Sequence, residues 1–227
     1  LSIALRLMTP VILLADGYVS NAADQWQIPE LSSFDTMVHT APPAVDDGDH
    51  VQELAFSRDA QSYGRPWITP GMPGLMYRVG GLEKDITTGH ISYDPQNHER
   101  MTALRAAKVD SVADWIPDQA IELGPDAGKL VIVGWGSTYG PIYQAANKTG
   151  VSFVHLRHLT PLPGNLGDLL GKFEKILVPE MNNGQLVTLL RDKLGVDPVS
   201  LTKISGQPFL INELVARVET ELGSTAK

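Results

Sequence analysis

The chain has 227 residues, of which 43% are apolar and 19% charged, and its formal net charge is −8. This composition is typical of a globular protein and argues against intrinsic disorder. Because the chain contains no cysteine, it cannot form a disulfide, a cysteine-ligated zinc site or an all-cysteine iron–sulfur cluster. The acidic balance argues against nucleic acid or an anionic membrane as the main partner, and the lack of disulfides fits a cytoplasmic protein.

The first 15 residues are strongly apolar, but they match neither a signal peptide nor a membrane span, because Arg6 and Pro10 interrupt the run. The sequence instead predicts the end of a helix through Leu7 and a strand over residues 11–15 that is buried on both faces, as in a parallel sheet. We expect this segment to be the tail of a domain whose earlier part is missing. A normal N-terminus shortened by processing is the alternative.

Two further helices are predicted in the first half of the chain. The dipeptide 16–17 (Asp-Gly) marks a turn, which a short helix over residues 18–27 follows. A second helix is predicted over residues 94–108, with Asp94 as its N-cap and Pro95 at its first helical position.

The stretch between these helices has an irregular composition. Residues 41–95 contain six prolines and seven glycines, which disfavour regular structure. They also contain large apolar side chains, including Trp67, Leu75 and Met76. We therefore expect this stretch to wrap over the surface of another subunit.

From Lys129 onward, apolar strands alternate with helices. The pattern predicts strands over residues 130–133, 151–156, 175–178 and 198–204, and helices over residues 138–147, 166–173, 184–194 and 210–222. Such alternation is typical of a parallel α/β domain with right-handed crossovers.

A glycine-rich turn, GWGSTYG over residues 134–140, follows the first predicted strand of this domain. Its spacing is one residue longer than the dinucleotide-binding fingerprint, and Arg157 rather than a carboxylate follows the second strand. The pattern favours a plain turn between strand and helix that contacts a neighbouring subunit. NAD(P) binding remains an alternative.

The sequence PEMNNGQ over residues 179–185 follows the third predicted strand. Ligands and partners of open α/β sheets meet the carboxyl ends of the strands, so this loop is a candidate functional site. Alternatively, Glu180 and Asn182 only cap the next helix. The candidate interface or access loop comprises Glu180, Met181, Asn182, Gly184, Gln185, Gly136 and Ser137.

His90, Asp94 and His98 are spaced four residues apart, as metal ligands on a helix can be. However, Pro95 makes one continuous helix through all three improbable, so they need not share a face. The sequence therefore predicts no metal-ligating residue, and it assigns no catalytic or cofactor-binding residue to this chain.

Several stretches, in this order, resemble the alpha subunit of 2-oxoacid:ferredoxin oxidoreductases, and most closely the 2-oxoglutarate type. They are TPVILLADGYV over residues 9–19, GLEKD over 81–85 with Gly89, Asp94-Pro95 and His98, RAAK over 105–108, VPEMNNGQL over 178–186 and GQPF over 206–209. The chain departs from the family at Lys84, where a histidine is more common.

The resemblance implies an enzyme that decarboxylates a 2-oxoacid on thiamine diphosphate, passes electrons through an iron–sulfur cluster to ferredoxin and transfers the acyl group to coenzyme A. It also implies a domain organisation. Residues 1–40 would be the C-terminal end of a pyrimidine-binding domain, residues 41–128 an irregular connector with one helix, and residues 129–227 a transketolase-C-terminal-like α/β domain.

The resemblance places thiamine diphosphate, Mg²⁺ and a [4Fe-4S] cluster on a companion beta subunit, so we expect this chain alone to be inactive. Its expected partners are that beta subunit, a second alpha chain and the N-terminal remainder of the alpha subunit, in a heterotetramer. Ferredoxin and coenzyme A would be substrates. The alternatives are a non-catalytic transketolase-C-like scaffold and an NAD(P)-binding α/β protein.

Overall fold

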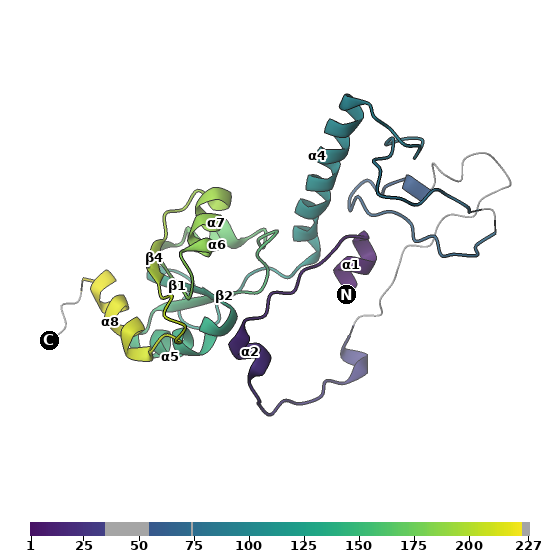
Figure 1. Ribbon diagram of the computed structural model, residues 1–227. Helices are drawn as coiled ribbons and strands as arrows, with labels where there is room; N and C mark the ends of the chain where they lie inside the picture. Colours follow the sequence, from purple (N-terminus) through teal and green to yellow (C-terminus); the bar gives the residue numbers. More distant parts are fainter. Residues whose placement is uncertain (35–54, 74, 224–227) are drawn as a thin grey trace. The chain divides into compact units, whose positions relative to one another are not determined.

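The computed structural model describes residues 1–34, 55–73 and 75–223 (Figure 1). The chain divides into two compact units. Unit 1 comprises Leu1–Leu13 and Gln25–Trp115, and unit 2 comprises Leu14–Asp24 and Ile116–Lys227.

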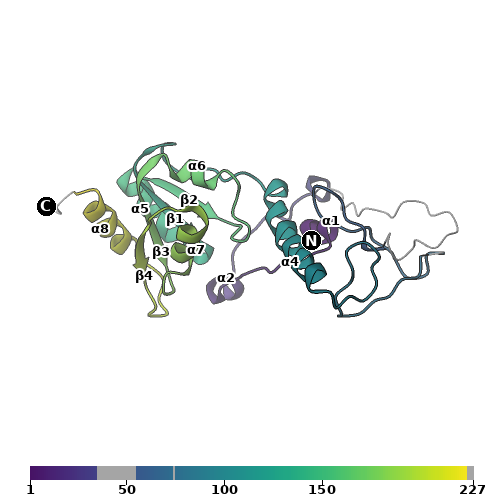
Figure 2. The same ribbon diagram turned by 90° about the horizontal axis from the view of Figure 1, so that it is seen from above.

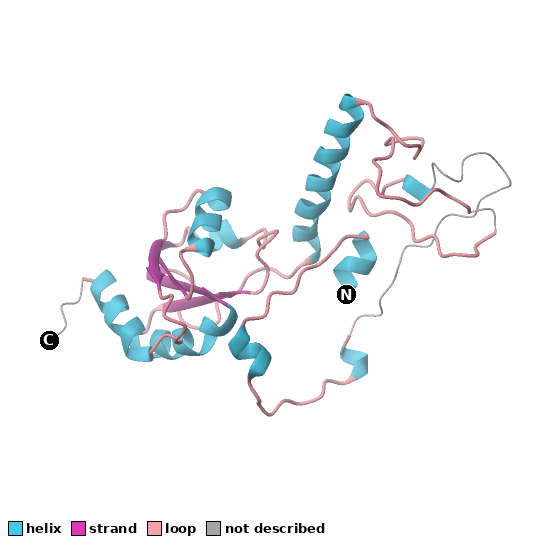
Figure 3. Ribbon diagram, viewed as in Figure 1, coloured by secondary structure: helices cyan, strands magenta, loops and turns pink. Residues whose placement is uncertain are grey.

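Unit 2 contains a parallel four-stranded sheet with the strand order β2-β1-β3-β4. The strands are β1 (Gly128–Trp135), β2 (Ser152–Leu156), β3 (Phe173–Glu180) and β4 (Val199–Thr202), drawn in magenta in Figure 3. The apolar, largely β-branched runs within β1, β2 and β3 suit strands that are covered on both faces, whereas the edge strand β4 is partly exposed. The predicted parallel α/β fold is confirmed.

Helices cover both faces of this sheet (Figures 1 and 2). One face packs against α5 (Tyr139–Thr149) and α8 (Ile211–Glu221), and the other against α6 (Leu166–Leu170) and α7 (Gln185–Leu194). Successive side chains of β1 alternate between the two cores: Val131 and Val133 face α6 and α7, whereas Leu130 and Ile132 face α5 and α8.

Several boundaries in unit 2 differ from the sequence prediction by one to three residues, and the largest difference is at the end of α6. The helix expected over residues 166–173 ends at Leu170, and Phe173 begins β3. Phe173 packs in the core with the α6 and α7 side chains, so its burial is better satisfied in the strand than at the end of a helix.

Unit 1 is built around one long helix, α4 (Pro95–Ser111), which η2 (Val112–Trp115) follows directly. The Asp94 side chain accepts hydrogen bonds from the backbone N–H groups of Gln96 at 3.2 Å and Asn97 at 3.1 Å. This N-cap and Pro95 at the first position begin the helix where the sequence predicted, and the helix ends three residues later than expected.

The described residues between 57 and 93 form neither a helix nor a strand apart from an isolated bridge between Lys84 and Ile91. The irregular structure predicted from proline and glycine is therefore confirmed for this part, while residues 41–54 and 74 of the predicted stretch lie outside the described residues. Leu75 is buried, whereas Met76 and Val79 are exposed. Some apolar side chains of the stretch thus lack partners among the described residues.

The strand predicted over residues 11–15 is wrong. Residues 11–14 form no strand, and their apolar side chains are exposed, with Leu13 at 89%. A strand must satisfy its backbone groups on a neighbouring strand, and none of the described residues offers one here. The preceding helix is confirmed as α1 (Ser2–Leu7).

The helix predicted over residues 18–27 is also shorter than expected. The structure has only α2 (Gly17–Asn21), capped by the side chain of Asp16, and a short 3₁₀ helix, η1, over Leu31–Ser33. No residue of α2 is buried. Since packing of an apolar face supplies most helix stability, a longer helix gains nothing here. No helix in the described ranges is both long and apolar enough to cross a membrane.

Candidate functional site

The two candidate loops follow adjacent strands of the sheet. Ile132 of β1 pairs with Leu177 of β3, and the same register places Trp135 level with Glu180. After β1 the chain continues into α5 on one face, and after β3 it continues into α7 on the other. The strand order changes direction at this point, which is where open α/β sheets generally bind ligands. The structure therefore brings the glycine-rich turn and the PEMNNGQ loop to one edge.

Glu180 ends β3 and has no exposed surface. Its Oε2 accepts a hydrogen bond from the Leu186 N–H at 2.8 Å, and its Oε1 accepts one from the Val187 N–H at 3.1 Å. Both donors belong to the first turn of α7, whose positive dipole end favours a carboxylate. Glu180 therefore caps α7 and holds the loop in place.

Asn182 fixes the turn itself. Its Oδ1 accepts hydrogen bonds from the N–H groups of Gly184 at 2.8 Å and Gln185 at 3.0 Å. Gly184 has φ 92°, a left-handed conformation that glycine adopts without strain. Met181, Asn183 and Gln185 are the residues of this loop that are exposed at the surface.

The glycine-rich turn after β1 is occupied by a carboxylate from the same chain. The Ser137 N–H donates to Asp16 Oδ2 at 2.8 Å, and the Val19 N–H donates to Asp16 Oδ1 at 3.0 Å. Gly136 has φ 59°, and a Cβ there would lie 3.2 Å from Asp16 Oδ2. Backbone N–H groups of this kind can hold anions. In this chain the anion is Asp16.

Two opposing effects act on the Asp16 carboxyl. Burial raises its pKa, but hydrogen bonds from Ser137 and Val19 to the charged form outweigh it and hold the pKa below its usual range. Sequence reasoning assigned Asp16 only to a turn. Its contact with Ser137 joins positions 121 residues apart, so no local pattern predicts it. The one signal in the sequence for a larger role was the place of Asp16 in the TPVILLADGYV stretch.

The other groups that suggested a dinucleotide site have structural partners. A Cβ at Gly134 would overlap the side chain of Ile142, so this glycine lets α5 pack closely on β1. The Arg157 guanidinium is 2.7 Å from Glu122 Oε1 and is therefore paired. With Asp16 at the turn, these contacts disfavour the NAD(P) alternative.

His155 lies near the carboxyl end of β2 and was given no role by sequence reasoning. It is buried against Tyr139, with ring centroids 4.9 Å apart in an edge-to-face arrangement. Its Nδ1 has no hydrogen-bond partner among the described residues. Burial, and then the charge of Arg157, lower the pKa of His155, which favours the neutral form of the ring.

The histidines near α4 do not converge on a metal site. His98 Nδ1 is 2.9 Å from Glu83 Oε2, Asp94 caps α4 and His90 is exposed. Within the described ranges, no three His, Asp or Glu side chains are grouped as metal ligands.

The stretches around residues 81–108 form a network that fastens a loop onto α4. Glu83 also contacts Arg105 at 3.3 Å, and the Asn97 side chain accepts from the Ile86 N–H and donates to the Lys84 carbonyl, both at 3.0 Å. Lys84 is buried, and its Nζ donates to the Leu82 carbonyl at 2.7 Å. The lysine that replaces the more common histidine is thus satisfied by the loop backbone.

Comparisons with known proteins agree with this picture. No family model matches the sequence. The chain is 41% identical over 218 residues to the 2-oxoglutarate oxidoreductase subunit KorA of Mycobacterium tuberculosis, a match that covers 93% of this chain and 32% of that subunit. The structure is similar to the 2-oxoglutarate:ferredoxin oxidoreductase from Magnetococcus marinus, with a TM-score of 0.75 and 26% identity, over 86% of this chain and 34% of that one.

The chain thus spans about a third of the length of these relatives. The similarity extends over 93% of its own residues. The chain is thus similar, over nearly all of its length, to a part of subunits of 2-oxoglutarate-type 2-oxoacid:ferredoxin oxidoreductases.

Proposed function

We propose that this chain is part of the alpha subunit of a 2-oxoglutarate-type 2-oxoacid:ferredoxin oxidoreductase. The enzyme oxidatively decarboxylates a 2-oxoacid to an acyl-CoA and passes the electrons to ferredoxin. The 41% identity over 93% of the chain carries this proposal. The related Magnetococcus marinus enzyme holds 2-oxoglutarate, coenzyme A and succinyl-CoA, which supports a dicarboxylic 2-oxoacid as the substrate class.

In this proposal thiamine diphosphate, Mg²⁺ and the [4Fe-4S] cluster belong to a beta subunit. The residues of this chain do not fit these groups: it has no cysteine for a cluster, and its described residues offer no three-ligand metal site. Further partners are a second alpha chain and the N-terminal remainder of the alpha subunit, acting together in the cytoplasm. The domain organisation is part of the proposal. It takes residues 1–40 as the C-terminal end of a pyrimidine-binding domain, residues 41–128 as an irregular connector with one helix, and residues 129–227 as a transketolase-C-terminal-like α/β domain.

The proposed contribution of this chain is to build an interface and an access route. Two loops lie at the carboxyl edge of the sheet, and side chains of this chain hold both by hydrogen bonds to backbone N–H groups. Glu180 and Asn182 hold the PEMNNGQ loop, and Asp16 holds the glycine-rich turn. Met181, Asn183 and Gln185 are exposed at the surface of this edge. The exposed apolar residues 11–14 add a surface of the kind that marks contacts between chains.

The test is reconstitution of the enzyme from its parts. The chain, the remainder of the alpha subunit and the beta subunit are combined, and 2-oxoglutarate-dependent reduction of a low-potential dye is measured. We expect activity only with all the parts, and none from this chain alone. Turnover by this chain unaided, or full activity without it, would show that the proposal is wrong.

A substitution at the loop separates an interface or access role from a scaffold role. Met181→Asp should lower the activity of the assembled enzyme with little change in the stability of the chain, because the side chain is 36% exposed. Gln144→Asp, on the exposed side of α5, is the matched control and should change neither. Unchanged activity of Met181→Asp in an intact complex would favour the non-catalytic scaffold.

A further inference from the structure

Unit 1 contains three cationic side chains that lie close enough to repel one another: Arg58, Arg65 and Lys108. We call them the cationic cluster. All three are partly buried. None of the three forms an ion pair with a carboxylate of the described residues. The ion pairs described in unit 1 join Glu83 to His98 and to Arg105.

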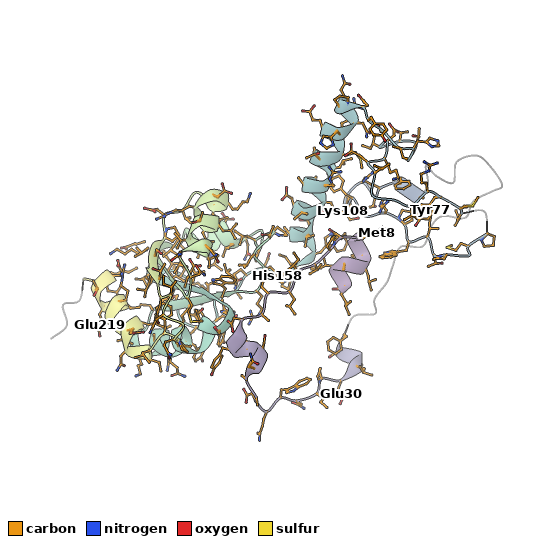
Figure 4. All side chains as sticks on the ribbon, viewed as in Figure 1. Met8, Glu30, Tyr77, Lys108, His158 and Glu219 are labelled. Carbon is orange, nitrogen blue, oxygen red and sulfur yellow. The ribbon has the colours of Figure 1, made fainter. Side chains whose placement is uncertain are left out.

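The hydrogen bonds of the cluster go to neutral acceptors. Lys108 Nζ donates to the Leu7 carbonyl at 2.9 Å, and Arg65 Nη2 lies 3.3 Å from the Met8 sulfur. Figure 4 labels Lys108 on α4 and Met8 directly after α1. The Leu7 carbonyl ends that helix, so its partial negative charge offsets a fraction of one of the three charges.

Arg58 is placed in the same way. Its Nη1 donates to the Phe56 carbonyl at 3.3 Å, and its Nη2 lies 3.6 Å from the Met101 sulfur. Carbonyl and thioether groups orient a guanidinium but carry no net charge. The cluster therefore keeps three positive charges together without a compensating negative charge in the described part of the chain.

Aromatic rings form the apolar side of the cluster. The Arg65 guanidinium lies over the Phe56 ring at 5.1 Å from its centroid, and the Phe56 ring meets the Tyr77 ring edge-to-face at 5.9 Å. A cation–π contact fixes the plane of Arg65 and leaves its N–H groups directed away from the ring. Limited access of water also strengthens any interaction with an anion.

Repulsion within the cationic cluster affects the pKa of Lys108. Burial, and then the charges of Arg65 and Arg58, lower the pKa of Lys108 to about 8. A bound anion would favour the protonated lysine and remove this opposition.

We propose that Arg58, Arg65 and Lys108 form a binding site for a phosphoryl group. Two planar guanidinium forks and one ammonium can donate to several oxygens at once. A phosphoryl group offers more oxygens than a carboxylate and up to two negative charges, so it matches three cations better. No motif in the sequence announced this site, because the three residues come from two separate segments of the chain.

The test is calorimetric titration of the full chain with inorganic pyrophosphate, and it needs no enzymatic turnover. We expect saturable binding that Arg65→Gln weakens by at least about tenfold, the loss typical of one charge-assisted hydrogen bond. Arg100→Gln is the control, because Arg100 is an exposed arginine on the same helix as Lys108. Arg65→Lys should recover part of the affinity if charge rather than folding is responsible.

Two further arms define the ligand. Raising the pH from 7 to 9.5 should weaken pyrophosphate binding as Lys108 loses its proton, and Lys108→Met should remove this dependence. ADP carries the same diphosphate group on a nucleoside. Tighter binding of ADP would identify a nucleotide as the source, and equal binding would identify free phosphate.

Three results would overturn the proposal. One is the absence of pyrophosphate binding at about 10 mM, a concentration that would detect even a weak site. Another is equal loss of affinity in Arg65→Gln and Arg100→Gln, which would indicate non-specific attraction. The third is binding of succinate as tight as that of pyrophosphate, which would make the site one for carboxylates.

Discussion

Glu180 is a carboxylate without exposed surface, and the first turn of α7 compensates its charge. Glu180→Ala should lower the free energy of unfolding by about 2 to 4 kcal/mol, because two buried N–H groups lose their acceptor and a cavity remains. Glu180→Gln should cost less, since its amide oxygen still accepts one bond. Urea denaturation measures both variants.

The matched control for Glu180 is Glu174→Ala, an exposed position of the same strand. It should change the free energy of unfolding by less than about 0.5 kcal/mol. A similarly small change in Glu180→Ala would mean that the capping bonds contribute nothing to stability.

Asp16 makes the stability of unit 2 depend on pH in the acid range. Its pKa in the folded chain is lowered, so its contribution is fully present above the unfolded-state pKa of about 3.9 and is lost as the pH falls through the folded value. The difference in free energy of unfolding between the natural chain and Asp16→Ala should therefore be about 1 kcal/mol from pH 5 to 7, as for other N-caps.

Below about pH 4 this difference should shrink towards zero as the folded carboxyl takes up its proton. Chemical denaturation at several pH values checks the sign. A difference that grows on acidification would contradict the bonds from Ser137 and Val19 as its cause.

At the scale of elements, the packing of α5 on β1 depends on Gly134. A Cβ at this position would overlap Ile142 and approach Thr138 Oγ1 to 3.0 Å. Gly134→Ala should therefore destabilise the chain by about 1 to 3 kcal/mol, as overpacking does in other cores. Thermal unfolding followed by circular dichroism measures the change.

Gly140 in the same run provides the control for this prediction. It lies within α5, and a Cβ there meets nothing within 4 Å. Gly140→Ala should be neutral or stabilise the helix by up to about 1 kcal/mol, the difference in helix propensity. If both alanine variants behave alike, the close approach of helix and strand is not the reason for Gly134.

At the scale of the whole molecule, some parts of the chain bury their apolar side chains and other parts expose them. The sheet of unit 2 has complete cores on both faces, whereas residues 11–14 and parts of the 57–93 stretch expose large apolar side chains. Exposed apolar surface of this extent is typical of chains that pack against others. It agrees with the proposal that this chain contributes one part of a larger enzyme.

The α/β architecture could be read from the sequence because its signals are local. Continuous apolar runs such as residues 130–133 specify strands covered on both faces, and Asp94 with Pro95 specifies where α4 begins. The same local pattern misled over residues 11–15, because an apolar run defines a strand only when a neighbouring strand accepts its hydrogen bonds.

The sequence by itself determined the fold class, the absence of cysteine chemistry and, through collinear motifs, the resemblance to 2-oxoacid:ferredoxin oxidoreductase alpha subunits. Only the tertiary structure decided that Asp16 occupies the glycine-rich turn, that Glu180 faces inward and that Arg58, Arg65 and Lys108 meet. The physical reason is separation along the chain: contacts such as Asp16 with Ser137 join distant segments, and no local pattern of residue types encodes which distant segment arrives.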